Sequence, residues 1–217
     1  MRKGAIFDMD GLLFDSERVY KNSWIKTAEH FGKERGAELA GLVSGAGEEG
    51  CRQAIKNFYP DVDVDKFFMH VVETAVKTFE RDGVEMMAGV VEILELFKAG
   101  GAKIAVASSS DMNVITRNLE RADIRKYFSA VVSGDDVANG KPAPDIFLKA
   151  AAEIGLAPED CYVFEDSYNG IRGAAKAGCA PVMIPDTSPA TDEMRELCAG
   201  IYPSLIDAAE AIRRNEI

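Results

Sequence analysis

The sequence contains few of the residues that most zinc sites and disulfide frameworks need. Its 217 residues include four cysteines and two histidines, and no cysteines are spaced as Cys-x-x-Cys. Cysteines scattered in this way are typical of reduced intracellular thiols, so neither a structural zinc site nor a disulfide framework is expected. No cysteine is followed six positions later by an arginine, which excludes the phosphate-binding loop in which a cysteine is the nucleophile.

Positive charge and long apolar runs are also scarce. The formal net charge is −11, and Lys and Arg form no run, so a nucleic-acid partner is not expected. No apolar run approaches the roughly 18 residues of a membrane span, and the first apolar stretch ends at Asp8, too early for a signal peptide. We therefore expect a soluble, cytoplasmic monomer without a membrane partner.

Two carboxylates follow a short apolar segment near the start of the chain. Residues 5–7 predict a buried strand, and the period of a strand directs Asp8 and Asp10 to the same side. Two like charges this close repel each other unless a cation or a shared proton lies between them. One such carboxylate can attack an electrophile while the other transfers protons or helps to hold a metal.

A helical block follows this segment. Apolar residues recur at helical spacing through residues 20–31 and 67–79, with two shorter helical stretches between them. Ser16 is placed to cap the first helix and Gly83 to end the last. This pattern predicts a helical block without a strand, residues 16–83.

After Gly89 the pattern changes to an alternation of strands and helices. The predicted strands are residues 102–107, 130–133, 161–164 and 181–184. Such an alternation predicts an α/β fold with a doubly wound, Rossmann-like parallel sheet. Because the strand at residues 4–7 has to join this sheet, the helical block is an insertion after strand one. The core domain is then residues 1–15 and 84–217.

Four polar clusters follow the predicted strands. They are Asp8 with Asp10, Ser108–Ser110, Gly140–Pro142 and Glu165–Ser167. Ligand sites of open α/β sheets lie beyond the carboxyl ends of the strands, so these clusters are expected to meet at one edge. Taken alone, each cluster is more typical of a helix cap or a solvated loop than of a functional site. Their coincidence at one edge favours a functional site.

The side chains of these clusters suit phosphoryl transfer. Carboxylates from two clusters form a set of hard oxygen ligands suited to Mg²⁺. Ser108, with backbone N–H groups at a helix start, suits phosphate oxygens, and Lys141 supplies a positive charge. Charge stabilisation of this kind accounts for most of the catalysis of phosphoryl transfer. Either Asp8 or Asp10 could accept the phosphoryl group.

The motifs resemble those of the haloacid dehalogenase superfamily of aspartate-nucleophile phosphotransferases. The matching segments, in chain order, are Asp8–Gly11, Ile104–Ser108, Gly140–Asp145 and Phe164–Ser167. Within the superfamily, the chain looks like the branch with a small helical-bundle cap inserted after strand one. That branch includes beta-phosphoglucomutase and many sugar-phosphate and nucleotide phosphatases. This resemblance implies that residues 16–83 are the cap domain.

The resemblance implies a role for each of the paired aspartates. Asp8 would be the nucleophile and a Mg²⁺ ligand. Asp10 would act as general acid and then as general base, and would bind the metal through its backbone carbonyl. An acidic residue at position 10 argues against dehalogenase chemistry, because the dehalogenases of the superfamily lack it.

The resemblance also implies which residues hold the phosphoryl group and the metal. Ser108, Ser109 and Lys141 would bind the phosphoryl group, and Lys141 would also balance the charge of the nucleophile. Asp166 would be the remaining metal carboxylate, with Glu165 as an additional metal ligand.

The cap bears on whether the activity is that of a phosphatase or a mutase. Beta-phosphoglucomutase binds a second phosphate with a cap lysine and arginine, where this chain has Ser44 and Glu48, and Tyr20 replaces its cap histidine. A carboxylate facing a phosphate weakens binding. We therefore expect a Mg²⁺-dependent phosphatase acting on a small phosphomonoester, a sugar phosphate or a nucleotide-like one, with a phosphohexomutase as the alternative. Candidate specificity residues are Tyr20, Trp24, Glu48 and Arg52, although Trp24 also fits the cap core.

Other motifs and protein classes fit less well. Gly45–Gly50 spells the dinucleotide fingerprint but follows a predicted helix, and residues 134–141 are one residue too long for a P-loop. A phospho-acceptor domain of receiver type carries its aspartate after a middle strand and has no cap. A binding protein without catalytic activity is also a poor match, because every catalytic position expected from the resemblance is filled in this chain.

Overall fold

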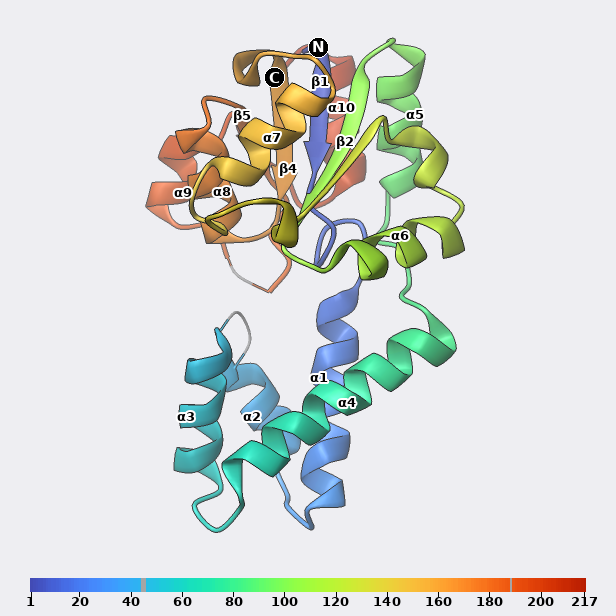
Figure 1. Cartoon of the computed structure of the whole chain (residues 1–217). Helices are drawn as coiled ribbons and strands as arrows, with labels where there is room; N and C mark the ends of the chain where they lie inside the picture. Colours follow the sequence, from blue (N-terminus) through green and yellow to red (C-terminus); the bar gives the residue numbers. More distant parts are fainter. Residues whose placement is uncertain (44–45, 188) are drawn as a thin grey trace. The chain divides into compact units, whose positions relative to one another are not determined.

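The computed structural model describes residues 1–43, 46–187 and 189–217 (Figure 1). The chain divides into two compact units, one of Met1–Phe14 with Met86–Ile217 and the other of Asp15–Glu85. We call them the core unit and the cap unit. That they act as a catalytic core and a substrate-covering cap stays a prediction. Ser44, one of the cap residues on which the sequence argument depends, lies outside the described residues.

The core unit is built on a parallel sheet with the strand order β3-β2-β1-β4-β5-β6. The strands are β1 (Gly4–Phe7), β2 (Lys103–Ser108), β3 (Ala130–Ser133), β4 (Cys161–Glu165), β5 (Ala180–Met183) and β6 (Gly200–Ile201). The predicted doubly wound fold is confirmed. The sequence did not predict β6, because two residues are too few to show a period.

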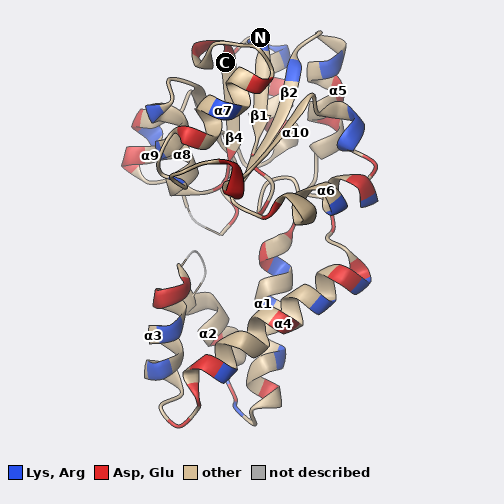
Figure 2. Ribbon diagram, in the orientation of Figure 1, with Lys and Arg blue, Asp and Glu red and all other residues tan. Residues whose placement is uncertain are grey.

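Helices cover both faces of this sheet (Figure 1). They are α5 (Val90–Ala99), α6 (Met112–Arg121), α7 (Asp145–Glu153), α8 (Tyr168–Lys176), α9 (Asp192–Leu197) and α10 (Leu205–Arg213). Three short 3₁₀ turns, Arg125–Tyr127, Gly134–Asp136 and Pro158–Asp160, complete the regular structure of the described core unit. Figure 2 shows Lys and Arg scattered among Asp and Glu along these helices.

Apolar side chains are buried on both faces of the sheet because successive residues of a strand point to opposite sides. On one face, Ile6 of β1 packs in a cluster with Phe147 of α7. On the other, the ring of Phe7 stacks on that of Phe164 with the centroids 4.7 Å apart, and Phe97 of α5 contacts both. The short apolar segment before Asp8 is thus a central strand, held rigidly where it ends.

In the described residues of the cap unit all regular structure is helical. The helices are α1 (Ser16–His30), α2 (Gly36–Val43), α3 (Glu48–Phe58) and α4 (Val64–Asp82). Their apolar faces enclose a core that includes Trp24, Leu39, Ile55 and Phe67. No described helix of either unit is both long and apolar enough to cross a membrane.

The two ends of the cap's helical block differ in how well they were predicted. Ser16 is the first residue of α1, and the N-cap is Asp15, whose carboxylate accepts a hydrogen bond from Arg18 N at 3.2 Å. Serine and aspartate are both good N-cap residues, so adjacent candidates cannot be separated by sequence. The other end is as predicted, since Gly83 follows α4 with a φ of 74° that favours glycine.

Two histidines stack on each other in the cap unit. The ring centroids of His30 and His70 lie 4.2 Å apart, and Thr27 Oγ1 lies 2.9 Å from His70 Nδ1. Partial burial and the neighbouring His30 lower the pKa of His70, and Lys77 adds to this effect while Glu73 opposes it. The folded cap therefore binds this proton less readily than the unfolded chain does.

We expect acid to destabilise the protein through His70. At a pH above 6.5, the ordinary pKa of histidine, His70 is neutral in both states and its lowered pKa does not affect stability. As the pH falls below 6.5, the unfolded chain binds the proton more readily than the folded protein, so the free energy of unfolding decreases until the pKa of the folded state is passed. His70→Gln, which does not titrate in this range, should lose less unfolding free energy than the unchanged protein between about pH 7 and pH 5. Urea titrations at each pH measure this, and equal losses would contradict the expectation.

Candidate active site

The end of β1 lies between the ends of two neighbouring strands (Figure 1). Phe7 of β1 is in register with Val106 of β2 and with Phe164 of β4. Because the strands are parallel, the residues that follow them emerge at one edge of the sheet. Asp8 is held there by a hydrogen bond from its backbone N–H to the Phe164 carbonyl at 3.0 Å.

A buried lysine joins two carboxylates at this edge. Lys141 Nζ lies 2.5 Å from Asp8 Oδ1 and 2.7 Å from Glu165 Oε1, and it also donates to the Ala107 carbonyl at 3.3 Å. The side chains are 8% exposed for Lys141, 8% for Asp8 and 1% for Glu165. Charges buried this deeply persist only when each is paired and hydrogen-bonded.

Burial and charge act in opposite directions on the pKa values of this group. Burial raises the pKa of Asp8, the Lys141 ammonium lowers it, and Glu165 and Asp10 add to the rise. Burial disfavours the charged form of Lys141, but Asp8 and Glu165 outweigh that effect and raise its pKa above the ordinary value. Lys141 therefore stays a cation and favours the ionised form of Asp8.

Glu165 is held in place from the opposite side by the start of α8. Its Oε2 accepts hydrogen bonds from the backbone N–H and from the hydroxyl of Ser167, both at 2.8 Å. A Cβ on Gly170 would lie 1.7 Å from Glu165 Oε1, so the carboxylate occupies the space that a side chain there would fill. Both oxygens are thus engaged by neighbouring residues, and Glu165 positions Lys141.

Three carboxylates gather around the same point. Oxygens of Asp8, Glu165 and Asp166 lie within 4.8 Å of one another. Burial raises the pKa of Asp166, Glu165 and Asp8 raise it further, and Lys141 opposes them. A Cβ on Gly11, whose φ is 79°, would lie 2.6 Å from Asp166 Oδ2, so this carboxylate packs directly on the backbone.

The composition of this group fits a divalent cation. One lysine cannot balance three nearby carboxylates, and a bound cation would relieve the repulsion that adds to the effect of burial on the pKa values of Asp8 and Asp166. Carboxylate oxygens are the ligands that Mg²⁺ prefers. Asp8 and Asp166 would hold the ion, while Glu165, already bonded through both oxygens, is less free to do so.

Asp10 lies beside the serines at and just after the end of β2. Ser110 Oγ donates to Asp10 Oδ2 at 2.7 Å, and Ser108 Oγ lies 3.3 Å from the same oxygen. Ser108 is fully buried, whereas Ser109 is exposed, with its backbone against Gly134. Sequence reasoning assigned phosphate contacts to Ser108 and Ser109 and no role to Ser110. The run of three serines was the available signal.

The four candidate specificity residues all lie in the cap unit. Tyr20 is 41% exposed, and its ring packs edge-on against Phe79. Trp24 is 6% exposed within the cap core, which supports a packing role. Glu48 accepts a hydrogen bond from Arg52 Nε at 2.9 Å. This ion pair offsets the negative charge on which the argument from Glu48 depends.

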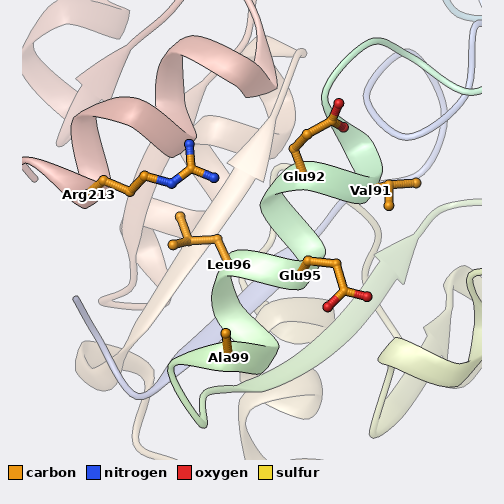
Figure 3. A pocket seen from close by; sticks show the side chains of 6 residues that line it. All are labelled: Val91, Glu92, Glu95, Leu96, Ala99 and Arg213. Carbon is orange, nitrogen blue, oxygen red and sulfur yellow. The ribbon is translucent and has the colours of Figure 1, made fainter.

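A shallow hollow elsewhere in the core unit contains none of these residues. It has a volume of about 530 Å³ and lies against α5 and α10 (Figure 3). Its lining is Val91, Glu92, Glu95, Leu96, Ala99 and Arg213. The catalytic candidates lie instead at the carboxyl ends of β1, β2 and β4.

Residues 5–184 match the sequence profile of the haloacid dehalogenase-like hydrolases. The chain belongs to this family. The matched range begins in β1, ends just after β5 and includes the cap unit. It therefore covers every residue that the sequence assigned to the site, and the predicted family membership is confirmed.

Two similar proteins of the family are named as phosphatases. A phosphorylated carbohydrates phosphatase from Thermotoga maritima is 34% identical over 177 residues, which cover 81% of this chain and 82% of that protein. A fructose-1-phosphate phosphatase from Escherichia coli is 33% identical over 182 residues, which cover 83% and 95%. A solved Thermotoga maritima structure assigned as a beta-phosphoglucomutase has a TM-score of 0.83 and 29% identity, with 98% and 99% covered.

The close approach of Glu165 to Gly170 leads to a prediction about stability. Gly170→Ala has to displace a buried carboxylate that holds Lys141, so it should lower the free energy of unfolding by about 1–3 kcal/mol, as overpacking does. Gly41→Ala is the matched control, because a Cβ there meets nothing within 4 Å in α2. It should raise the free energy of unfolding by about 0.5–1 kcal/mol. Urea unfolding followed by circular dichroism measures both, and changes of the same sign would contradict this account.

Proposed function

We propose that the protein is a Mg²⁺-dependent phosphatase that hydrolyses a small phosphomonoester through an aspartyl-phosphate on Asp8. The main support is the convergence of Asp8, Lys141 and Asp166 in one buried group at the end of β1. Asp10 lies two residues further along the chain. The named phosphatases among the relatives support the same reaction class.

In the first step Asp8 attacks the phosphorus of the ester. The new bond joins an Asp8 carboxylate oxygen to phosphorus, and the bond from phosphorus to the sugar oxygen breaks. Asp10 gives a proton to that oxygen, so the leaving group departs as a neutral alcohol. Lys141, 2.5 Å from Asp8 Oδ1, favours the ionised nucleophile before the attack and balances charge around it.

In the second step water attacks the phosphorus of the aspartyl-phosphate. Asp10, now ionised, takes a proton from this water as the new oxygen–phosphorus bond forms. The bond between phosphorus and Asp8 breaks, inorganic phosphate leaves, and the Asp8 carboxylate is restored beside Lys141. A bound Mg²⁺ would supply charge neutralisation for the phosphate oxygens, and Asp8, the Asp10 carbonyl and Asp166 would hold it.

A sugar phosphate is the substrate class best supported. The two named relatives act on phosphorylated carbohydrates and on fructose 1-phosphate, and both are about one-third identical to this chain over most of its length. Glu48 and Glu49, at the exposed start of α3, could accept hydrogen bonds from sugar hydroxyls. We propose that the cap unit supplies these contacts.

A phosphohexomutase is the second candidate. The structural likeness to the protein assigned as a beta-phosphoglucomutase favours it. Against it stands Glu48, an acidic residue where the mutase carries a cation. The two functions differ in the acceptor of the phosphoryl group, which is water in one case and a sugar hydroxyl in the other.

A substrate panel separates these functions. Phosphate release is measured for sugar and nucleotide monophosphates with Mg²⁺ and with a chelator, beside a coupled assay for conversion of beta-glucose 1-phosphate to glucose 6-phosphate. We expect Mg²⁺-dependent release that is fastest with a sugar phosphate. We expect no isomerisation, because Glu48 stands where a mutase needs a cation to bind the second phosphate. Isomerisation primed by a sugar bisphosphate would establish the mutase instead.

Two aspartate variants control the panel. Asp8→Asn removes the nucleophile and should abolish phosphate release from every substrate. Asp160→Asn changes a half-buried aspartate before β4 that pairs with Lys3 at the opposite edge of the sheet, and it should leave release unchanged. Full activity in Asp8→Asn would disprove the proposed mechanism.

A further inference from the structure

Asp10 accepts a hydrogen bond from Ser110, a residue to which the two proposed steps assign no role. Its carboxyl is only half-buried and lies on the loop that follows β1. Rotation about the terminal bond of an aspartate side chain is soft and nearly two-fold, so an unrestrained carboxyl presents either oxygen. Ser110 Oγ donates to Oδ2 at 2.7 Å and so removes this freedom.

The serine that holds Asp10 is itself held by the sheet. The backbone N–H of Ser110 donates to Ser108 Oγ at 3.1 Å. Ser108 ends β2, is fully buried and is in register with Ser133 of β3. Ser108 reaches Asp10 Oδ2 only at 3.3 Å, so the hydroxyl of Ser110 makes the shorter bond. A central strand therefore determines where the Asp10 carboxyl points.

The direction of this hydrogen bond decides which oxygen can carry a proton. A hydroxyl that donates to Oδ2 occupies a lone pair there, so the proton of the neutral carboxyl belongs on Oδ1. When Asp10 is ionised, the same bond persists and is strengthened by the charge. One contact thus suits Asp10 both as a general acid and as a general base.

We propose that Ser110 is a positioning residue for Asp10, holding Oδ2 so that Oδ1 exchanges the proton in both steps. The inference rests on the proposed function. In the first step, the proton on Oδ1 passes to the sugar oxygen as its bond to phosphorus breaks. In the second, Oδ1 receives a proton from water as the water oxygen bonds to phosphorus.

The experiment uses two esters with different needs for that proton. Fructose 1-phosphate releases an alcohol, whereas p-nitrophenyl phosphate releases a stable anion that needs no acid. We compare kcat/KM, which reports the steps up to departure of the leaving group, in Ser110→Ala and the unchanged enzyme. We expect about a tenfold loss for the sugar ester, part of the ~10²–10⁴-fold that general acids contribute, and less than about a twofold change for the aryl ester.

Two variants serve as controls. Ser110→Thr keeps the hydroxyl and should retain most of the activity on both esters. Ser129→Ala removes an exposed serine before β3 and should match the unchanged enzyme.

Equal losses on both esters in Ser110→Ala would show a role in phosphate binding or folding and would overturn the inference. No loss on either ester would do the same. If the unchanged enzyme hydrolyses neither these esters nor any other member of the substrate panel, the proposed function fails and the inference with it. If hydrolysis depends on Asp8 but Ser110→Ala changes kcat/KM equally for the two esters, the proposed function stands and only the inference about Ser110 is refuted.

Discussion

One buried ammonium group sets the geometry of the site. Lys141 donates to carboxylates that follow two different strands, Asp8 after β1 and Glu165 at the end of β4. Removing one partner from a buried ion pair costs about 3–5 kcal/mol, because an uncompensated charge stays behind. The strands, the loop that carries Lys141 and the first turn of α8 are therefore linked through a single nitrogen atom. With Asp166 the group still has excess negative charge, which is the physical basis for expecting a cation.

Two missing side chains make this density of carboxylates possible. Gly11 leaves room for Asp166, and Gly170 leaves room for Glu165, each within less than 3 Å of where a Cβ would stand. The positive φ of Gly11 is a second reason for glycine at that turn. Both carboxylates pack on backbone instead of on side chains, so they have little freedom to move away from the charges that they face.

The sequence predicted the parts of the site that depend on strand position. Asp8 and Glu165 were placed at one edge because parallel strands end together, and the register confirms that placement. The contacts between Glu165, Ser167 and Gly170 were not predicted, because they depend on how α8 packs against β4 and leave no periodic pattern. Ser110 was noted only as part of a serine run, since its bond to Asp10 links loops about a hundred positions apart. The roles of the other site residues were assigned from their match to the family's motifs.

The central claim is that Asp8 becomes phosphorylated during turnover, and locating the phosphoryl group tests it most directly. The enzyme and a sugar phosphate are mixed with Mg²⁺, quenched in acid within milliseconds and treated with borohydride, which reduces an aspartyl-phosphate to homoserine. Peptide mass spectrometry then finds the reduced residue. The account predicts reduction at Asp8 alone, and only when both substrate and Mg²⁺ are present. Reduction at Asp10 or Asp166, or none while substrate is consumed, would contradict it.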